Sequence, residues 1–170
     1  MVRKLVCVAL GLMVALGLAA YGVLWARNAA ARLQHSSNLE QLAKSMATYL
    51  AEEGDGRFYP GSLGALMTVK SVKDSDVFVS PRDIYPVPLV TGTPSSYTSC
   101  FDRYKQWQFL DGFPNTIMAW DRQAFFGDTR YVAFFDYHVE RVDATQFDTL
   151  LRELDAAVKQ HAQPREPRYE

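Results

Sequence analysis

The chain has 170 residues, 22% of them charged, and a formal net charge of −1 at pH 7, without the basic excess or basic patch that nucleic-acid binding requires. Its two cysteines, Cys7 and Cys100, lie on opposite sides of a predicted membrane boundary, which excludes a stapling disulfide within one domain. Residues 1–26 carry two basic and no acidic side chains, so the remaining 144 residues have a net charge of −3. One folded domain is expected at this length.

The first feature is an uncharged run of 22 residues, Leu5–Ala26. A helix of this length spans about 33 Å, enough to cross a hydrocarbon core of about 30 Å. Tyr21 and Trp25 stand near its end, where aromatic side chains favour the headgroup level. Basic residues flank the run on both sides: Arg3, Lys4 and Arg27. Residues 1–26 are therefore predicted to be a membrane anchor, and the membrane is a predicted partner through Leu5–Ala26.

A cleaved signal peptide is the alternative, with Leu5–Leu16 as its apolar core and Gly17–Ala19 as its cleavage site. Cleavage there would leave an apolar mature N-terminus, which a retained bilayer segment explains better; a buried helix of a soluble protein is a third interpretation. The basic N-terminal flank favours a cytoplasmic N-terminus. We expect a single-pass protein of the inner (cytoplasmic) membrane with its domain, residues 27–162, outside the cytoplasm, or a secreted protein if the segment is cleaved.

A helix is predicted over residues 27–53. Its amphipathic face consists of residues at three- and four-residue steps: Leu39, Leu42, Met46 and Tyr49. Ser37–Glu40 has the spacing of a capping box, so the helix either continues from the anchor or restarts there. Gly54–Gly56 is expected to end it, because two glycines around an aspartate favour turn backbone.

Residues 54–142 are expected to form loops and antiparallel strands. Ser62–Met67 is predicted as a short helix capped by Ser62, and the proline-rich stretch from Pro81 to Pro94 as a surface loop. An Asp111–Gly112 turn precedes the last of these strands. The β-prone stretches predicted as strands are Val77–Val79, Tyr97–Phe101 and Thr116–Trp120.

The clearest β signal is a hairpin, Tyr131–Phe135 and His138–Val142, with a two-residue connection, Asp136–Tyr137. A last helix is predicted over residues 143–162, starting at Asp143 or Thr145, with Thr145–Asp148 as a variant capping box. Its apolar stripe comprises Phe147, Leu150, Leu151, Leu154 and Val158. The polar tail, residues 163–170, is predicted to be disordered.

Taken in order, four local motifs resemble those of bacterial pilin-like, pseudopilin-type proteins across roughly Asn38–Val142. They are Asn38–Leu42, Asp55–Pro60, Val77–Asp83 and Asp136–Glu140. The resemblance implies an α+β pilin-like fold, in which a long N-terminal transmembrane helix continues into an amphipathic helix packed on a small antiparallel sheet, with a C-terminal helix. It also implies a structural or interaction role in a type II secretion or pilus-like assembly, with other pilin-like subunits as partners.

The chain departs from this family pattern in its prepilin-type segment. The family site Gly-Phe-Thr-Leu-x-Glu is matched best by Gly11–Leu16, which lacks the phenylalanine and the glutamate. The missing peptidase site favours the alternative hypothesis, a solitary membrane-tethered or secreted binding module with no filament role.

Two further departures lie late in the chain. Phe126 replaces a family histidine, and Tyr137 replaces a family glycine. A positive φ at Tyr137 would cost on the order of 1 kcal/mol.

No catalytic, metal-binding or cofactor-binding residue is predicted, and we expect the protein not to be an enzyme. Its histidines are scattered over a linker, a hairpin and the tail without metal-ligand spacing: His35, His138 and His161. Asp136 and Glu140 flank His138, but the turn is expected to displace Asp136 from the shared strand face. Ser62 lacks the spacing of a nucleophile elbow.

Acidic residues are expected to be solvated rather than to bind calcium. Glu52, Glu53 and Asp55 form an acidic helix end without the spacing of an EF-hand loop. Some pilin-like proteins have a calcium site in a C-terminal loop, and the resemblance would place it at Asp111, Asp121 or Asp128.

Two further groups of side chains are expected mainly to fill the core. Cys100 is predicted to be a buried strand cysteine, with an intermolecular bridge as the alternative. The middle third is rich in aromatic residues, some of which could instead form an exposed groove for a partner. They are Tyr104, Trp107, Phe109, Phe113, Trp120, Phe125 and Phe126.

Overall fold

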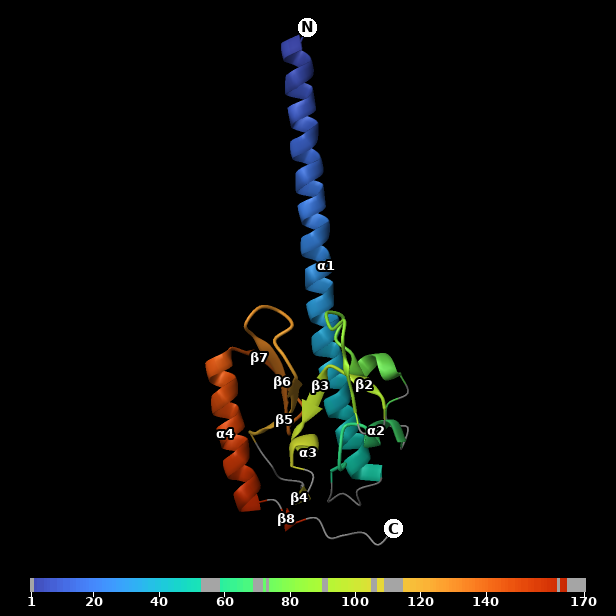
Figure 1. The fold of residues 1–170 in the computed structure, drawn as a ribbon, viewed down its shortest axis with the longest axis vertical. Helices are drawn as coiled ribbons and strands as arrows, with labels where there is room; N and C mark the ends of the chain where they lie inside the picture. The colour runs from blue at the N-terminus through green and yellow to red at the C-terminus, as the bar shows by residue number, and fades with distance from the viewer. Residues whose placement is uncertain are drawn as a thin grey trace. The chain divides into compact units, whose positions relative to one another are not determined.

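The computed structural model describes residues 2–52, 59–68, 72, 74–89, 92–104, 107–108, 115–161 and 163–164. The chain divides into two units, Met1–Leu33 and Gln34–Glu170 (Figure 1). The sequence placed this boundary at residue 26, where the apolar run ends. The boundary lies later because the first fully buried side chain of the N-terminal helix, among those described, is His35.

The N-terminal helix α1 (Val2–Glu52) is unbroken, so Ser37–Glu40 does not restart it. Instead the Ser37 hydroxyl accepts a hydrogen bond from Gln41 Nε2, 3.3 Å away, within the helix. In the first unit, apolar side chains from Leu10 to Trp25 are exposed. Among the described residues, α1 is the helix long and apolar enough to cross a membrane, a test that signal sequences also pass. In the second unit, the predicted apolar face is confirmed, because Leu39, Leu42 and Met46 are fully buried.

The second unit is built on an antiparallel sheet of four strands in the order β3-β5-β6-β7. The strands are β3 (Tyr97–Ser99), β5 (Ile117–Asp121), β6 (Arg130–Phe134) and β7 (Val139–Val142). All five residues of β5 are buried, as expected for a strand covered on both faces. Trp120 of β5 lies 6.3 Å from the Phe147 ring of the last helix, whereas its neighbour Asp121 contacts His35 of α1. The predicted α+β class is therefore confirmed.

The hairpin β6-β7 is confirmed, but its predicted two-residue connection is wrong. The Tyr137 N–H donates to the Phe134 carbonyl at 2.9 Å, and the Phe134 N–H donates to the His138 carbonyl at 3.0 Å, which leaves a three-residue connection. Tyr137 has a φ of 71°, a left-handed conformation that glycine adopts more easily. A hydrogen bond of 3.2 Å between the Tyr137 and Tyr59 hydroxyl groups helps to hold it there.

The last helix, α4 (Ala144–His161), begins at a capping box that differs from the predicted one. The Asp143 carboxylate accepts the Gln146 N–H at 2.8 Å, and the Gln146 side chain accepts the Asp143 N–H at 3.0 Å. Asp143 is thus the cap, and the alternative start at Thr145 is wrong. In the predicted stripe Phe147, Leu154 and Val158 are buried, and Leu150 and Leu151 are half-buried.

In the part of the sequence between α1 and β3, two predicted segments differ from the structure. Val77–Val79 is not a strand, because η1 (Ser75–Phe78) is a 3₁₀ helix whose cap, Asp74, accepts the Asp76 N–H at 2.9 Å. The proline-rich stretch is not entirely loop, because β1 (Val87–Pro88) pairs with β2 (Pro94–Ser95). Each strand is only two residues long, which suits a segment whose prolines lack N–H donors.

The remaining elements are short. The predicted helix near Ser62 is α2 (Ala65–Thr68), and Leu63 and Leu66 are fully buried. The predicted strand Tyr97–Phe101 ends early, because the Ser99 hydroxyl accepts the Asp102 N–H and caps α3 (Cys100–Arg103). Gln163–Pro164, predicted within the disordered tail, forms β8, which pairs with β4 (Trp107–Gln108). The predicted turns at Gly54–Gly56 and Asp111–Gly112, and residues 165–170, lie outside the described residues.

Candidate functional site

The most distinctive feature of the second unit is a fully buried histidine, His35, on the inner face of α1. It precedes Leu39 by four residues and Leu42 by seven, so it continues the apolar face that packs into the core. A buried imidazole needs polar partners at both nitrogens, because an unpaired buried polar group costs about 1–3 kcal/mol.

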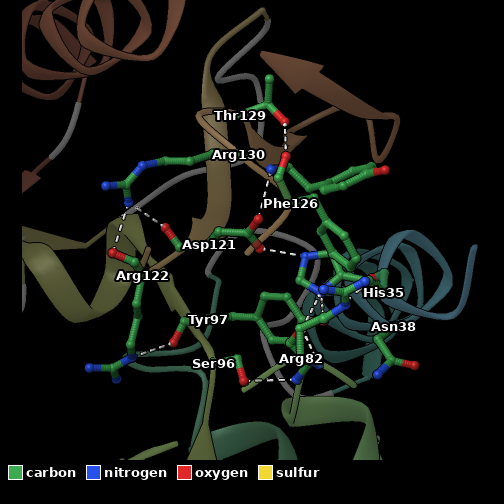
Figure 2. Close-up of polar contacts among 12 residues, drawn as sticks. His35, Asn38, Arg82, Ser96, Tyr97, Asp121, Arg122, Phe126, Thr129 and Arg130 are labelled. Atoms are coloured by element: carbon green, nitrogen blue, oxygen red, sulfur yellow. Dashed lines mark hydrogen bonds and ion pairs between the residues drawn. The ribbon is translucent and has the colours of Figure 1, made fainter. Parts of the chain in front are cut away.

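Both ring nitrogens of His35 have such partners. Nε2 lies 2.7 Å from Asp121 Oδ1 at the end of β5, the contact drawn in Figure 2. Nδ1 lies 2.8 Å from the Ser80 hydroxyl oxygen. The Tyr97 hydroxyl of β3 also approaches Nδ1, at 3.3 Å. We call these four residues the His35 cluster: His35, Ser80, Tyr97 and Asp121. With Asp121 ionised, Nε2–H donates to the carboxylate, and Nδ1 makes its hydrogen bond with Ser80.

Asp121 is held at both carboxylate oxygens. Oδ2 accepts the Tyr131 N–H at 2.8 Å while Oδ1 faces His35. Its backbone carbonyl accepts a hydrogen bond of 2.9 Å from Arg130 Nη1. Burial raises the pKa of the Asp121 carboxyl, and the hydrogen bond and charge of His35 oppose this rise.

Ser80 is positioned by the backbone around it. Its N–H donates to the Ser96 hydroxyl at 2.7 Å, and its own hydroxyl oxygen accepts the Arg82 N–H at 3.2 Å. One turn further along α1, Asn38 Nδ2 donates to the Val79 carbonyl at 3.0 Å. Thus two polar side chains of α1 attach the segment that follows η1 to the helix.

Aromatic rings surround the imidazole of His35. The ring centroids of four residues lie 5.0 to 5.6 Å from it: Tyr97, Phe125, Phe126 and Tyr131. The rings of Phe126 and His35 meet in an edge-type arrangement, with their centroids 5.2 Å apart. The enclosure separates the His35 cluster from water, which strengthens its electrostatic interactions.

Serine, histidine and aspartate in a row resemble the residues of a hydrolytic triad, but the arrangement differs in two ways. In such a triad the aspartate binds Nδ1 and the serine binds Nε2, whereas here the two partners are exchanged. Ser80 is 1% exposed, and His35 and Asp121 are 0% exposed, so no substrate reaches the serine in this conformation. The geometry is that of a structural link between α1, the segment after η1, β3 and β5.

The surface histidine His138 has the neighbours that its sequence position suggested, and one more. Its Nε2 lies 3.6 Å from Glu140 Oε1, and its Nδ1 contacts the Asp136 carboxylate. Asp136 lies in the hairpin connection, outside β6 and β7, and contacts His138 from there. Burial acts to raise the pKa of the Asp136 carboxyl, but the hydrogen bonds and the charge of His138 together lower it below its ordinary value. The His138 ring stacks on Phe134 at 4.2 Å, and all three polar side chains are exposed.

The acidic candidates do not come together in the part of the chain that the structure describes. There, no three histidine, cysteine, aspartate or glutamate side chains are arranged to hold a metal ion. Asp121 is committed to His35 and Tyr131, and Asp128 and Glu52 are exposed. Glu53, Asp55 and Asp111 and the side chain of His161 lie outside the described residues.

Cys100 is fully buried as predicted, but it is the first residue of α3 rather than a strand residue. Burial raises the pKa of its thiol, with a further contribution from the Asp102 charge. Of the aromatic group, Trp120 is buried and Tyr104, Phe125 and Phe126 are half-buried. The side chain of Trp107, and Phe109 and Phe113 entirely, are outside the described residues.

Sequence reasoning missed the His35 cluster and assigned His35 to a linker. A local signal was present, since His35 and Asn38 extend the apolar face of the helix toward its N-terminus. Its partners carried no comparable signal, because Ser80 and Asp121 are 45 and 86 residues away.

Comparisons with protein-family models, curated proteins and solved structures found no match to this chain. The function is therefore inferred from the sequence motifs, the fold and the geometry of the His35 cluster.

Proposed function

We propose that the chain is a membrane-anchored, pilin-like structural or interaction protein, which displays its second unit outside the cytoplasm and associates with similar subunits in a secretion or pilus-like assembly. The observation that carries this proposal is α1 itself. A single helix, Val2–Glu52, combines exposed apolar side chains in its first part with a buried apolar face in its second. A membrane helix that continues into the core of a small α+β domain suits anchorage and display.

The His35 cluster supports a structural role. A helix anchored in a bilayer transmits lateral force to its domain, and the domain must resist separation from the helix. Buried charge-assisted hydrogen bonds are stronger than neutral ones. The hydrogen bond of this kind between His35 and Asp121 ties α1 to β5, and a neutral one from Asn38 ties α1 to the Val79 carbonyl. The cluster therefore acts as a polar lock on the position of α1 against the sheet, and the proposed role is non-enzymatic.

The intact mass of the protein purified from its native membranes tests the proposal. Loss of Met1–Gly11, with or without N-methylation, would support pilin-type processing and assembly. An unprocessed chain that needs detergent for extraction would contradict assembly and leave a solitary tethered binding module, which the lack of a glutamate in Gly11–Leu16 favours. Loss through Ala19 would contradict anchorage and indicate a secreted domain.

Association in the membrane is tested separately by cysteine cross-linking. Single cysteines at consecutive positions from Leu12 to Leu18, in a Cys7→Ala background, are oxidised in native membranes; buried Cys100 can remain. Assembly predicts disulfide-linked dimers at positions that recur every three or four residues. Glu153→Cys, on the exposed face of α4, serves as the control for random collision. Equal and low cross-linking at every position would contradict association through α1.

A further inference from the structure

Exposed large apolar side chains of the second unit, among the described residues, occur in a single short segment. Ile84 is 79% exposed, Tyr85 is 83% exposed and Val87 is 49% exposed. We call residues 84–87 the Ile84 segment. Isolated exposed apolar residues are common. Three within four positions indicate a contact surface, because the other large apolar side chains that the structure describes in this unit are covered.

Hydrogen bonds to α1 locate the Ile84 segment within the second unit. Asn38 contacts the Val79 carbonyl, and His35, three residues earlier in the helix, contacts Ser80. The chain therefore advances along α1 toward Gln34, the end at which this unit joins the apolar part of the helix. A turn closed by the Asp83 N–H on the Ser80 carbonyl, at 3.0 Å, then keeps the beginning of the segment close to that end.

The other end of the segment is located in the same way. Val87 pairs with Ser95 in the β1-β2 hairpin, and the next residue, Ser96, accepts the Ser80 N–H through its hydroxyl group at 2.7 Å. Both ends of the Ile84 segment are thus within a few residues of Ser80 and hence of His35.

We propose that the Ile84 segment inserts into the headgroup layer of the bilayer in which the apolar part of α1 is anchored. This inference rests on the membrane anchorage in the proposed function. His35 is nine positions after Ala26 in α1, a rise of about 13 Å, and the headgroup layer occupies about 5–7 Å beyond the hydrocarbon core. The remaining gap of about 6–8 Å is the length of roughly two extended residues.

The chemistry of the segment fits a lipid interface. Tyrosine is enriched at the headgroup level because its ring is apolar and its hydroxyl group can stay hydrated. Three exposed arginines could bind lipid phosphates. Arg82 lies beside the segment, and Arg27 and Arg32 lie on α1. A second copy of the chain is a less suitable occupant, because Pro86 and Pro88 lack the N–H groups that strand pairing requires.

Site-specific fluorescence on the full chain tests this inference. An environment-sensitive fluorophore is attached to Tyr85→Cys, or separately to Ile84→Cys, in the Cys7→Ala background. The protein is reconstituted into vesicles of phosphatidylcholine and phosphatidylglycerol, with or without lipids that carry a nitroxide quencher at the headgroup. The matched control is Glu153→Cys, which is also exposed but lies on α4. We expect emission at both segment positions to shift to shorter wavelength and to be quenched, and emission at position 153 to do neither.

The outcomes separate this inference from the anchorage on which it rests. If the protein does not float with the vesicles, the anchorage itself fails. If it floats but positions 84 and 85 are quenched no more than position 153, anchorage stands and the membrane docking of the segment is overturned. A shift at position 85 that depends on protein concentration, without quenching, would assign the segment to a second copy and also overturn the proposal.

Discussion

A histidine on the buried face of a helix is stable only where the fold supplies polar partners. His35 obtains them from Asp121 and Ser80, and it lies within a ring of aromatic side chains. Removing one member of a buried charged pair leaves the other without compensation, which makes such pairs sensitive to mutation even where their net contribution is small. Single substitutions in the His35 cluster therefore test it most sharply.

We predict that Asp121→Ala lowers the free energy of unfolding by about 3–5 kcal/mol, because it leaves His35 Nε2 and the Tyr131 N–H unpaired. His35→Ala should be comparably destabilising, and the double variant should lose less than the sum of the two single losses. Urea unfolding in detergent, followed by circular dichroism, measures all three variants.

The control for this cycle is the exposed pair of Glu40 and Lys44, one turn apart on α1. Lys44→Ala should change stability by only about 0.3–0.5 kcal/mol, because water screens the pair. If the losses from Asp121→Ala and His35→Ala simply add, the two residues are not coupled and the polar lock is refuted.

At the scale of elements, hydrogen bonding at the helix start decides where α4 begins. Two chain positions, Asp143 and Thr145, were equally consistent with a cap in the sequence. Only Asp143 and Gln146 exchange the reciprocal hydrogen bonds of a capping box.

Asp143→Ala is therefore predicted to cost about 1 kcal/mol, because the Gln146 N–H loses its acceptor. Thr145→Ala is the matched control, since the Thr145 hydroxyl group caps nothing and the change should stay within about 0.5 kcal/mol. Thermal unfolding of the two variants against the parent chain makes the comparison. A larger loss from Thr145→Ala would show that the helix begins two residues later in solution.

At the scale of the whole molecule, two buried ionisable groups of the core are expected to make the free energy of unfolding fall as the pH becomes alkaline. Burial raises the pKa of the Cys100 thiol above its ordinary 9.0, and burial, assisted by the Asp121 charge, raises the pKa of the Tyr97 hydroxyl above its ordinary 10.0. Both groups keep their protons in the folded protein under conditions where the unfolded chain releases them. Their contribution to stability is present below pH 9.0 and 10.0, respectively, and is lost as the pH rises further.

The urea midpoint is accordingly predicted to fall between about pH 8 and about pH 10.5. Cys100→Ala and Tyr97→Phe should each lower the urea midpoint at pH 8. Each should also make the midpoint fall less steeply with pH, since each removes one group that keeps its proton in the folded protein. Midpoints measured across this interval test the prediction. A decline of the same slope in both variants and in the parent chain would assign the alkaline sensitivity to other groups.

Local patterns were sufficient for the long elements. The apolar positions of α1 and the stripe of α4 were predicted from their spacing. The apolar run Leu5–Ala26 was predicted from its length, and the strand around Ile117 and the hairpin β6-β7 from their β-prone residues. Each is a regular structure whose hydrogen bonds and buried face repeat along neighbouring residues, so its signal lies within the element itself.

Short segments were predicted less well because distant contacts determine their conformation. Val77–Val79 has strand-forming residues, yet it takes part in a 3₁₀ turn capped by Asp74 and bound to Asn38. Tyr137 adopts a glycine-like conformation while its hydroxyl group is hydrogen-bonded to Tyr59, 78 residues earlier. Tertiary contacts of this kind override the local conformational propensity of a short segment.

The sequence by itself determined which residues form the apolar helix, the core and the principal strands, because burial follows a periodic pattern. Tertiary structure alone decided that His35 meets Ser80 and Asp121, residues from different elements that folding brings within 2.8 Å and 2.7 Å of its ring. Polar partners in a core are chosen by distance and angle in space, and a hydrogen bond across 86 residues has no periodic trace in the chain.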